Sequence, residues 1–306
     1  MIISVDTGNK QIKTVRKVFT AGLVEHDGEP AFGGDVLKYK GKYYTLSEKR
    51  IPYMADKTKD ERYFILTLFA IAYELEGTLD DIEGDLIDIT LLLGLPPAHY
   101  SMYKQNYEKY YKRSEEIIEF ELNKKSYYIN ISEVKIYPQA YAAIANDIGT
   151  VKKFDRAIII DIGGFTSDIL QIQNGKADLS VCYSEENGTI QFYNLVKNRM
   201  AMKHGVKMNE SDIDVIINGG DSAYAKWIEK DVVVLSNEYI DDFLNTIREY
   251  GIDLRTCETI FVGGGSLLFR NILEKSDKIG MRMFLEGLNA NAKGYKELYS
   301  VARRSR

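Results

Sequence analysis

The sequence predicts an α/β protein built from two related lobes. Apolar segments of strand length alternate with segments of helical periodicity along the chain, which is the pattern of strand–helix units. The opening segment Ile2–Gly8 is an apolar strand that ends in Asp-x-Gly, and Ala157–Gly163 repeats this pattern. The two segments lie about half of the 306-residue chain apart, a spacing that favours an internal duplication. The length itself fits about two domains.

Composition excludes several classes of protein. Cys182 and Cys257 are the two cysteines, too few for a disulfide scaffold or a zinc ribbon and typical of a reducing cytoplasm. The 40 basic and 45 acidic side chains give a formal charge of -5, so we expect no direct DNA binding. The richest apolar stretch, Phe64–Leu75, is shorter than the ~18 residues that span a bilayer. We therefore expect a soluble, cytoplasmic protein with no membrane segment.

The first half is expected to open with strands and to continue with a core-facing helix. Val36–Tyr39 and Tyr43–Leu46 predict a small hairpin. Thr58 and Glu61 have the spacing of a capping box, which predicts that a helix follows. One face of that helix is apolar, with Phe64, Leu68, Ile71, Ala72 and Leu75 at helical spacing.

A buried strand and a polar helix come next. The nearly continuous apolar run Ile87–Leu93 predicts a strand covered on both faces. The tyrosine-rich segment that ends near Arg113 predicts a solvated helix with its tyrosines packed inward. Val134–Tyr137 predicts a further strand, and Pro138 is expected to start a helix as a first-turn proline.

The second half is expected to open with a hairpin, as the first half does. The strands expected in this half are Ala157–Gly164, Thr166–Gln173 and Thr259–Val262. The expected helices are Thr189–His204, Asn237–Tyr250 and Asn289–Val301.

The two Asp-x-Gly turns carry the candidate chemistry. Glycine permits a tight reversal whose backbone N–H groups can point at a phosphate, and aspartate can hold Mg²⁺ through its waters. Lys13, on the strand after the first turn, could add a charge-assisted contact worth ~1.5–3 kcal/mol. For either turn alone a simple hairpin is the better interpretation. The pair, together with a later triple glycine, favours a nucleotide site.

That triple glycine is Gly263-Gly264-Gly265-Ser266, between a predicted strand and a predicted helix. It does not complete a dinucleotide fingerprint, because Leu268 stands where a third small residue is needed. It fits a nucleoside or phosphate that lies against the backbone, and a close strand-to-helix packing turn is the alternative. No Walker sequence and no Gly-x-Ser-x-Gly elbow occurs in the chain.

Four segments together resemble the phosphate 1, connect 1, phosphate 2 and adenosine motifs of the actin, Hsp70 and sugar kinase superfamily. They occur in that order as Asp6–Lys13, Pro138–Ala143, Asp161–Asp168 and Phe261–Ser266. Within the superfamily, the short length and the Lys38–Tyr44 hairpin look most like the ParM/StbA group of plasmid-segregating, actin-like ATPases.

This resemblance implies an actin-like ATPase fold of two ribonuclease H-like lobes, with ATP and Mg²⁺ in a cleft between them. Lobe I would be residues 1–156, with a hairpin insertion near 33–57, completed by the C-terminal helix 288–306. Lobe II would be residues 157–287. The resemblance also implies filaments made by head-to-tail self-assembly, and a DNA-binding adaptor of the ParR type.

The resemblance also assigns roles to individual residues. Asp6 and Asp161 would lie at the metal, Asp168 would be the catalytic acid or base, and Gln139 would orient the attacking water. The nucleotide would contact three further sets of residues: Thr7, Gly8, Asn9, Lys10 and Lys13; Gly163, Gly164, Phe165 and Thr166; and Gly263, Gly264, Gly265 and Ser266.

Two positions depart from the pattern of the relatives. Asn9 stands where actins and ParM often have Ser or Thr, so a hydroxyl contact to the phosphate is missing. Gln139 stands where some ParM relatives carry Glu. Because glutamine cannot accept a proton at neutral pH, Asp168 is the better base.

Two other functions use the same superfamily features. A small-molecule kinase, such as a pantothenate or sugar kinase, is the alternative, since type III pantothenate kinases also use Asp-x-Gly-Asn turns. A membrane-tethered divisome or pilus actin relative would need an amphipathic terminal helix, and Val301–Arg306 lacks the apolar face for one.

Overall fold

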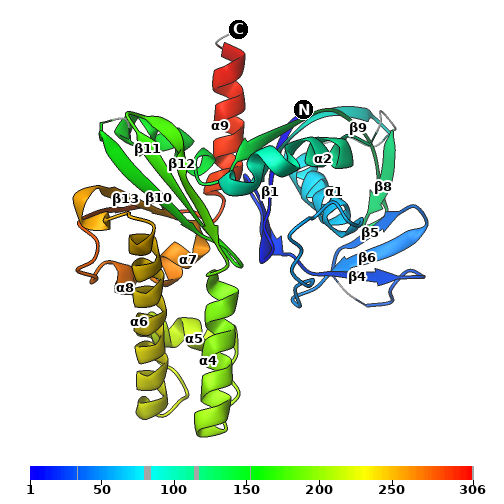
Figure 1. Ribbon diagram of the computed structural model, residues 1–306. Helices are drawn as coiled ribbons and strands as arrows, with labels where there is room; N and C mark the ends of the chain where they lie inside the picture. The colour runs from blue at the N-terminus through cyan, green and yellow to red at the C-terminus, as the bar shows by residue number, and fades with distance from the viewer. Residues whose placement is uncertain (33, 79–83, 114–116, 152, 305–306) are drawn as a thin grey trace. The chain divides into compact units, whose positions relative to one another are not determined.

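The computed structural model describes residues 1–32, 34–78, 84–113, 117–151 and 153–304 (Figure 1). The chain divides into two compact units, each described here by itself. Unit 1 comprises Met1–Asn146 and Leu288–Arg306, and unit 2 comprises Asp147–Gly287. The first border therefore lies at 146/147, earlier in the chain than the predicted 156/157.

Unit 1 is built on a mixed sheet, which has nine strands within the described residues, in the order β3-β2-β1-β7-β9-β8-β5-β6-β4. The strands are β1 (Ile2–Thr7), β2 (Gln11–Thr14), β3 (Val18–Thr20), β4 (Leu23–His26), β5 (Val36–Tyr39), β6 (Lys42–Leu46), β7 (Leu86–Leu95), β8 (Ile118–Leu122) and β9 (Lys125–Pro138). β1, β7 and β9 are parallel neighbours, whereas β2 pairs antiparallel with β1. The predicted small hairpin is present as β5 and β6.

Successive side chains of β1 point to opposite faces of the sheet, and a helix covers each face. Ile3 and Val5 belong to the same apolar core as the buried residues of α1 (Arg62–Glu76). On the other face, the Ser4 hydroxyl donates to the carbonyl oxygen of Ala292 in α9 (Ala290–Arg304). The order of buried residues along β1 thus places α1 and α9 on opposite sides of the sheet.

The predicted capping box at the start of α1 is wrong. The helix begins at Arg62 with Glu61 as its N-cap, and no side chain caps it. Thr58 lies before the helix, where its hydroxyl and its amide both donate to Asp56 Oδ1, at 2.6 and 3.0 Å. Burial stabilises α1 in place of capping, since the predicted apolar face is fully buried, with Phe64, Leu68, Ile71, Ala72 and Leu75 all at 0% exposure.

Gly294 allows α9 to pack closely against unit 1. A Cβ atom at position 294 would lie 1.7 Å from the carbonyl oxygen of Ala142. We expect Gly294→Ala to lower the free energy of unfolding by about 1–3 kcal/mol, because the helix must move away from that carbonyl. Urea denaturation measures this change. Gly28→Ala is the matched control, since no atom of the described residues lies within 4 Å of a Cβ there. A loss of stability in both variants would contradict the packing argument.

The chain after β9 differs from its prediction. Pro138 does not start a helix but is the last residue of β9, paired with Leu95 at the end of β7. A tight turn follows, and helical structure resumes as the 3₁₀ helix η3 (Ala142–Asp147) and then α3 (Ile148–Val151). Proline is tolerated at the end of this strand because the ladder needs no further donor there.

Unit 2 is built on a sheet that has five strands within the described residues, in the order β12-β11-β10-β13-β14. The strands are β10 (Arg156–Ile162), β11 (Ser167–Gln173), β12 (Lys176–Glu185), β13 (Glu258–Val262) and β14 (Met281–Phe284). Its longer helices are α4 (Thr189–His204), α5 (Glu210–Ile217) and α6 (Lys226–Glu249), and α7 (Gly263–Leu268) and α8 (Arg270–Leu273) are short. Ile158, Ile160 and Ile162 of β10 pack into one core with these helices.

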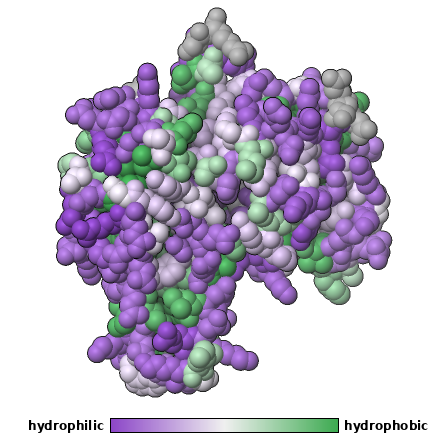
Figure 2. All heavy atoms as spheres, viewed as in Figure 1, coloured by the Kyte–Doolittle hydropathy of each residue, from purple (hydrophilic) through white to green (hydrophobic). Residues whose placement is uncertain are grey.

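The predicted helix Asn237–Tyr250 is the second half of α6, which begins at Lys226. The first half of α6 exposes Trp227, Val233 and Val234, with 56%, 41% and 44% of their surfaces accessible, and this obscures the apolar periodicity in the sequence. Figure 2 shows hydrophobic residues gathered over this helical layer on an otherwise mostly hydrophilic face. Among the described residues, no helix combines the length and the apolar character that crossing a membrane requires.

Candidate functional site

The first Asp-x-Gly segment closes the hairpin between β1 and β2. We call residues 8–10 turn 1. The strand register pairs Asp6 with Lys13 and Thr7 with Ile12 on either side of it. A Cβ atom at Gly8 would lie 2.7 Å from the carbonyl oxygen of Gln11, so this reversal requires glycine.

Asp6 lies buried at the base of turn 1, with 3% of its surface exposed. Its Oδ1 accepts a hydrogen bond of 2.8 Å from Gln139 Nε2. Its Oδ2 lies 3.8 Å from Lys13 Nζ. A carboxamide and an ammonium group thus fix the direction of this carboxylate, and the structure brings Gln139 to a hairpin pair whose Asp6 lies 133 residues earlier in the chain.

Gln139 is positioned by the turn that follows β9. The backbone amide of Gln139 donates to the carbonyl oxygen of Leu95 at 2.8 Å. The next residue, Ala140, is buried and has a left-handed backbone with φ of 59°. The amide of Ala140 donates to Asn291 Oδ1 at 3.0 Å, so α9 supports this strained residue. The contact with α9 thereby helps to hold Gln139 against Asp6.

The side chain of Asn9 holds turn 1 to the rest of unit 1. Its Oδ1 accepts hydrogen bonds from the Tyr63 hydroxyl at 2.7 Å and from the Met54 amide at 3.3 Å. On the other side, Lys57 Nζ donates to the carbonyl oxygen of Thr7. The carbonyl oxygen of Lys10 accepts from the Ala21 amide at 3.0 Å. No motif in the sequence marks Lys57 or Tyr63, so neither residue was predicted to support turn 1.

The second Asp-x-Gly segment closes the hairpin between β10 and β11. We call residues 163–166 turn 2. The amide of Gly163 donates to the carbonyl oxygen of Thr166 at 2.9 Å, and a Cβ at Gly163 would lie 2.9 Å from the same oxygen. The start of α4 fixes the backbone of turn 2, since the amides of Thr189 and Ile190 donate to the carbonyl oxygens of Gly163 and Gly164 at 3.1 and 2.8 Å. The carbonyl oxygen of Phe165 accepts from the Gly188 amide at 2.9 Å.

Two carboxylates lie side by side at the base of turn 2. Asp161 and Asp168 are direct partners in the antiparallel register of β10 and β11, so their side chains share one face of the sheet. They are buried, with 7% and 4% of their surfaces exposed. Like charges directly opposite each other destabilise a sheet. A pair of buried carboxylates beside a glycine turn is a candidate functional site.

The glycine-rich segment Gly263–Ser266 forms the start of α7. β10 and β13 are parallel, and their register places Asp161 opposite Val262. Gly263 has a φ of 85°, and a Cβ there would lie 2.3 Å from Asp161 Oδ1. A Cβ at Gly265 would lie 2.3 Å from Ile162 Cγ2. The glycines that flank Gly264 therefore let this segment approach the end of β10.

Ser266 differs from the other predicted contacts. Its side chain is buried, and its hydroxyl donates to the carbonyl oxygen of Val262 one turn earlier. The hydroxyl is thus already engaged inside α7.

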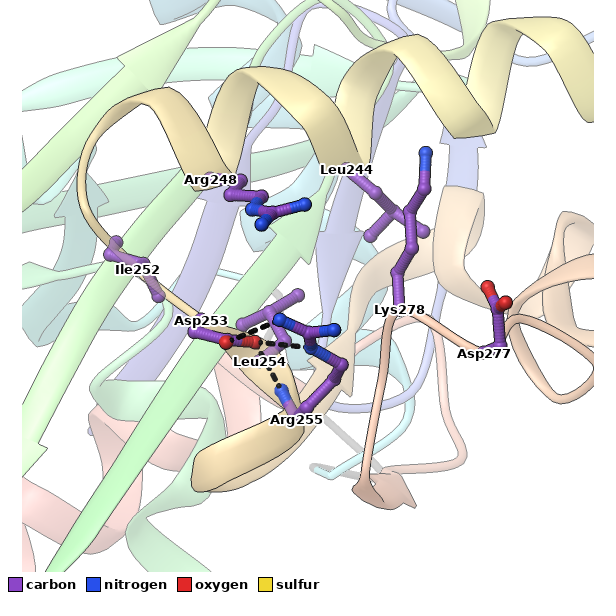
Figure 3. A pocket seen from close by; sticks show the side chains of 8 residues that line it. All are labelled: Leu244, Arg248, Ile252, Asp253, Leu254, Arg255, Asp277 and Lys278. Carbon is purple, nitrogen blue, oxygen red and sulfur yellow. Dashed lines mark hydrogen bonds and ion pairs between the residues drawn. The ribbon is translucent and has the colours of Figure 1, made fainter.

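A small pocket of about 200 Å³ lies elsewhere in unit 2, between the end of α6 and the loop before β14 (Figure 3). Arg255 forms an ion pair with Asp253 there, with a distance of 2.7 Å between Nη2 and Oδ2. The Arg255 guanidinium holds the pKa of Asp253 well below its usual range. Asp253 precedes the amino end of β13, whereas Gly263 follows its carboxyl end, so this pocket is separate from the glycine-rich segment and turn 2.

Cys182 lies on β12, and the charge of Asp168 affects the pKa of its thiol. Burial, with a smaller contribution from the Asp168 charge, raises the pKa of the Cys182 thiol to about 11. We expect slow alkylation of this half-buried thiol at pH 8, rising as the pH approaches 11, because the thiolate is the reactive form. Asp168→Asn should lower the thiol pKa and speed the reaction. Mass spectrometry after timed exposure to iodoacetamide measures both rates.

Cys182→Ser is the control in that experiment, since Cys257 is 3% exposed and its thiol pKa is also raised, mainly by burial. An unchanged pH profile in Asp168→Asn would place the Asp168 charge away from the thiol.

The donors present suit a magnesium ion that keeps most of its waters. Among the described residues, no three His, Cys, Asp or Glu side chains are grouped so that they could hold a metal. Mg²⁺ typically binds through one or two carboxylates together with waters and phosphate oxygens. Asp6 in unit 1, and Asp161 with Asp168 in unit 2, supply carboxylates of this kind next to turns that only glycine allows.

Two family models match the chain. Residues 4–141 match the N-terminal domain of actin-like proteins, and residues 159–275 match the C-terminal domain of archaeal, MreB-like actin homologues. No curated protein sequence matches the chain.

Solved structures resemble the whole chain. A 15-stranded ParM filament from Clostridium botulinum has a TM-score of 0.76 at 18% identity, covering 98% of this chain and 99% of that one. An archaeal actin homologue in complex with ADP has a TM-score of 0.73 at 16% identity, covering 99% of both chains. The AlfA filament from B. subtilis plasmid pLS32 has a TM-score of 0.63 at 17% identity, covering 96% of this chain and 97% of that one. The predicted actin-like fold is thus confirmed, and this chain belongs to the actin-like proteins.

Proposed function

We propose that this chain binds Mg²⁺ and ATP through its two Asp-x-Gly turns, polymerises into filaments and hydrolyses the bound ATP. The observation that carries the proposal is the cross-strand pair Asp161 and Asp168. These two buried carboxylates lie beside turn 2, and the backbone of Gly263 lies close to Asp161. Buried carboxylates gathered beside a glycine turn are candidates for metal binding and proton transfer.

Backbone amides and lysine would bind the phosphates. Turn 1 and turn 2 both need glycine, and their backbones are held by neighbouring elements, so they would present their amides with little reorganisation on binding. Lys13, whose side chain is 15% exposed, would contact a phosphate oxygen while it remains near Asp6. Gly263–Gly265 would allow the nucleoside to lie against the backbone.

Asp6 and Asp161 would hold the Mg²⁺ ion through its waters. When bound, this ion neutralises charge that develops on the transferred phosphoryl group. Gln139 donates to Asp6 through Nε2, so its Oε1 can accept a hydrogen bond from a water and orient it. Asp168 would accept the proton of the attacking water, because a carboxylate can act as a base and a carboxamide cannot.

Filament formation is supported by the filament structures among the structural relatives and by apolar side chains that unit 2 exposes on α4 and α6. These include Leu195, Met202, Trp227, Val233 and Val234. Apolar surface of this kind suits a contact between subunits. We further propose that the filament segregates plasmid or phage DNA in the cytoplasm through a ParR-type adaptor, since the net charge of -5 disfavours direct DNA binding.

Pelleting and electron microscopy with ATP, with ADP and without nucleotide test the proposal. We expect filaments with ATP and fewer or shorter filaments with ADP. A protein that stays monomeric at micromolar concentration in ATP would contradict the filament function. A coupled turnover assay tests the kinase alternative, because a small-molecule kinase should consume ATP rapidly only after its acceptor is added.

A further inference from the structure

Three hydroxyl groups are buried together behind turn 1. They belong to Thr7, the last residue of β1, and to Tyr107 and Tyr111 of α2 (Tyr100–Lys112). These residues are 0%, 2% and 0% exposed. None of the three hydroxyl oxygens has a hydrogen-bond partner within the part of the chain that the structure describes. We call this set the hydroxyl cluster.

The members of the hydroxyl cluster lie close to one another. Tyr107 and Tyr111 are one helical turn apart, and their ring centroids are separated by 5.5 Å. Burial raises the pKa of both tyrosines, and nearby hydroxyls act in the opposite direction: those of Thr67 and then Thr7 at Tyr111, and that of Thr7 at Tyr107. Thr7 Oγ1 is therefore near both phenol oxygens, although no hydrogen bond joins any of the three to a described residue.

An unpaired hydroxyl inside a protein is costly, and native structures almost always provide it with a partner. Phenylalanine would fill the same space at both tyrosine positions without that cost. A single buried water typically makes about three hydrogen bonds to polar groups that would otherwise lack partners. Each hydroxyl can both donate and accept, so three of them offer what one water needs. A metal ion is a poor occupant, because the cluster contains no carboxylate.

We infer that one internal water occupies the hydroxyl cluster and links α2 to the end of β1. Through this water, Tyr107 and Tyr111 are positioning residues for Thr7, whose own carbonyl oxygen accepts from Lys57 Nζ. Thr7 directly precedes Gly8, so the water fixes the point from which turn 1 departs. The consequence for nucleotide binding rests on the proposed function, whereas the water itself does not.

A double-mutant cycle on the full chain without nucleotide tests the water. We expect Tyr107→Phe and Tyr111→Phe each to lower the melting temperature by about 1–3 °C, the scale of one lost hydrogen bond in a chain of this size. The double variant should lose less than the sum, because the first substitution already weakens the shared water. Tyr103→Phe, a partly buried tyrosine of the same helix, is the control and should melt like the parent protein.

Two outcomes of the cycle would overturn the inference. Single variants that melt at or above the parent temperature would mean that the hydroxyls are simply unpaired. Strictly additive losses would mean that the two tyrosines share no water. A crystal structure adds a direct readout: density for a water within hydrogen-bond distance of all three hydroxyls supports the inference, and direct contacts among the hydroxyls contradict it.

The positioning role has its own matched pair of variants. Tyr107→Phe removes one hydroxyl of the cluster and should lower the ATP affinity that calorimetry measures several-fold, whereas Tyr103→Phe, which lies outside the cluster, should keep the parental affinity. Equal affinities in the two variants would refute the positioning role. Because the melting experiments contain no nucleotide, a failure of the ATP proposal alone would leave their result intact.

Discussion

Replacing Asp168 with alanine is expected to lower ATP hydrolysis by about 10²–10⁴-fold, the usual contribution of a positioned acid or base. Asp168 is 4% exposed and lies opposite Asp161 in the strand register, next to turn 2. Its loss removes the proposed proton acceptor but leaves the glycine-rich turns and Asp161 in place. Nucleotide affinity should therefore stay measurable by calorimetry while phosphate release slows.

Two further variants sharpen this test. Asp168→Asn keeps the shape of the side chain and should be slowed as strongly as Asp168→Ala, because the amide cannot take a proton. Asp242→Asn replaces an exposed carboxylate of α6 in the same unit and should hydrolyse ATP at the parental rate. Normal turnover in Asp168→Asn would assign the base to another residue, and loss of nucleotide affinity would indicate that Asp168 acts in binding.

The sequence predicted the two glycine turns because their geometry depends on a few neighbouring residues. Asp-x-Gly after an apolar strand specifies a reversal within a few residues, and the structure has such reversals at Gly8 and Gly163. The same holds for the register that sets Lys13 opposite Asp6, since hairpin pairing follows from the turn. Strong local signals of this kind also predicted α4 over its full length, Thr189–His204.

Contacts between segments that are distant in the sequence could not be predicted from local patterns. Lys57 and Tyr63 support turn 1 only because the chain folds back on itself, and no pattern around them indicates this. Pro138 was expected to start a helix, but pairing of β9 with β7 extends the strand through it. Capping of α1 by Thr58 failed because burial of its apolar face stabilises the helix without a side-chain cap. In each case tertiary packing decided what local preference left open.

The second large effect is expected from Gly263→Ala. Gly263 has a φ of 85°, and a Cβ there would lie 2.3 Å from Asp161 Oδ1 and 2.7 Å from the carbonyl oxygen of Ile162. An L-residue in this left-handed backbone costs about 1–3 kcal/mol, and the contact with the end of β10 adds about 1–3 kcal/mol more. The substitution should lower the stability of unit 2 and displace the Asp161 carboxylate, so ATP affinity should fall as well.

Gly251→Ala separates the two contributions. Gly251 has a similar φ of 77°, yet within the described part of the chain no atom lies within 4 Å of a Cβ at that position. It should therefore lose stability through backbone strain alone and keep the parental ATP affinity. The difference in unfolding free energy between the two variants, from urea denaturation, measures the contact with Asp161 and Ile162. Since Gly263 is proposed to matter through its approach to Asp161, equal stability and equal ATP affinity in both variants would remove the glycine-rich segment from the site.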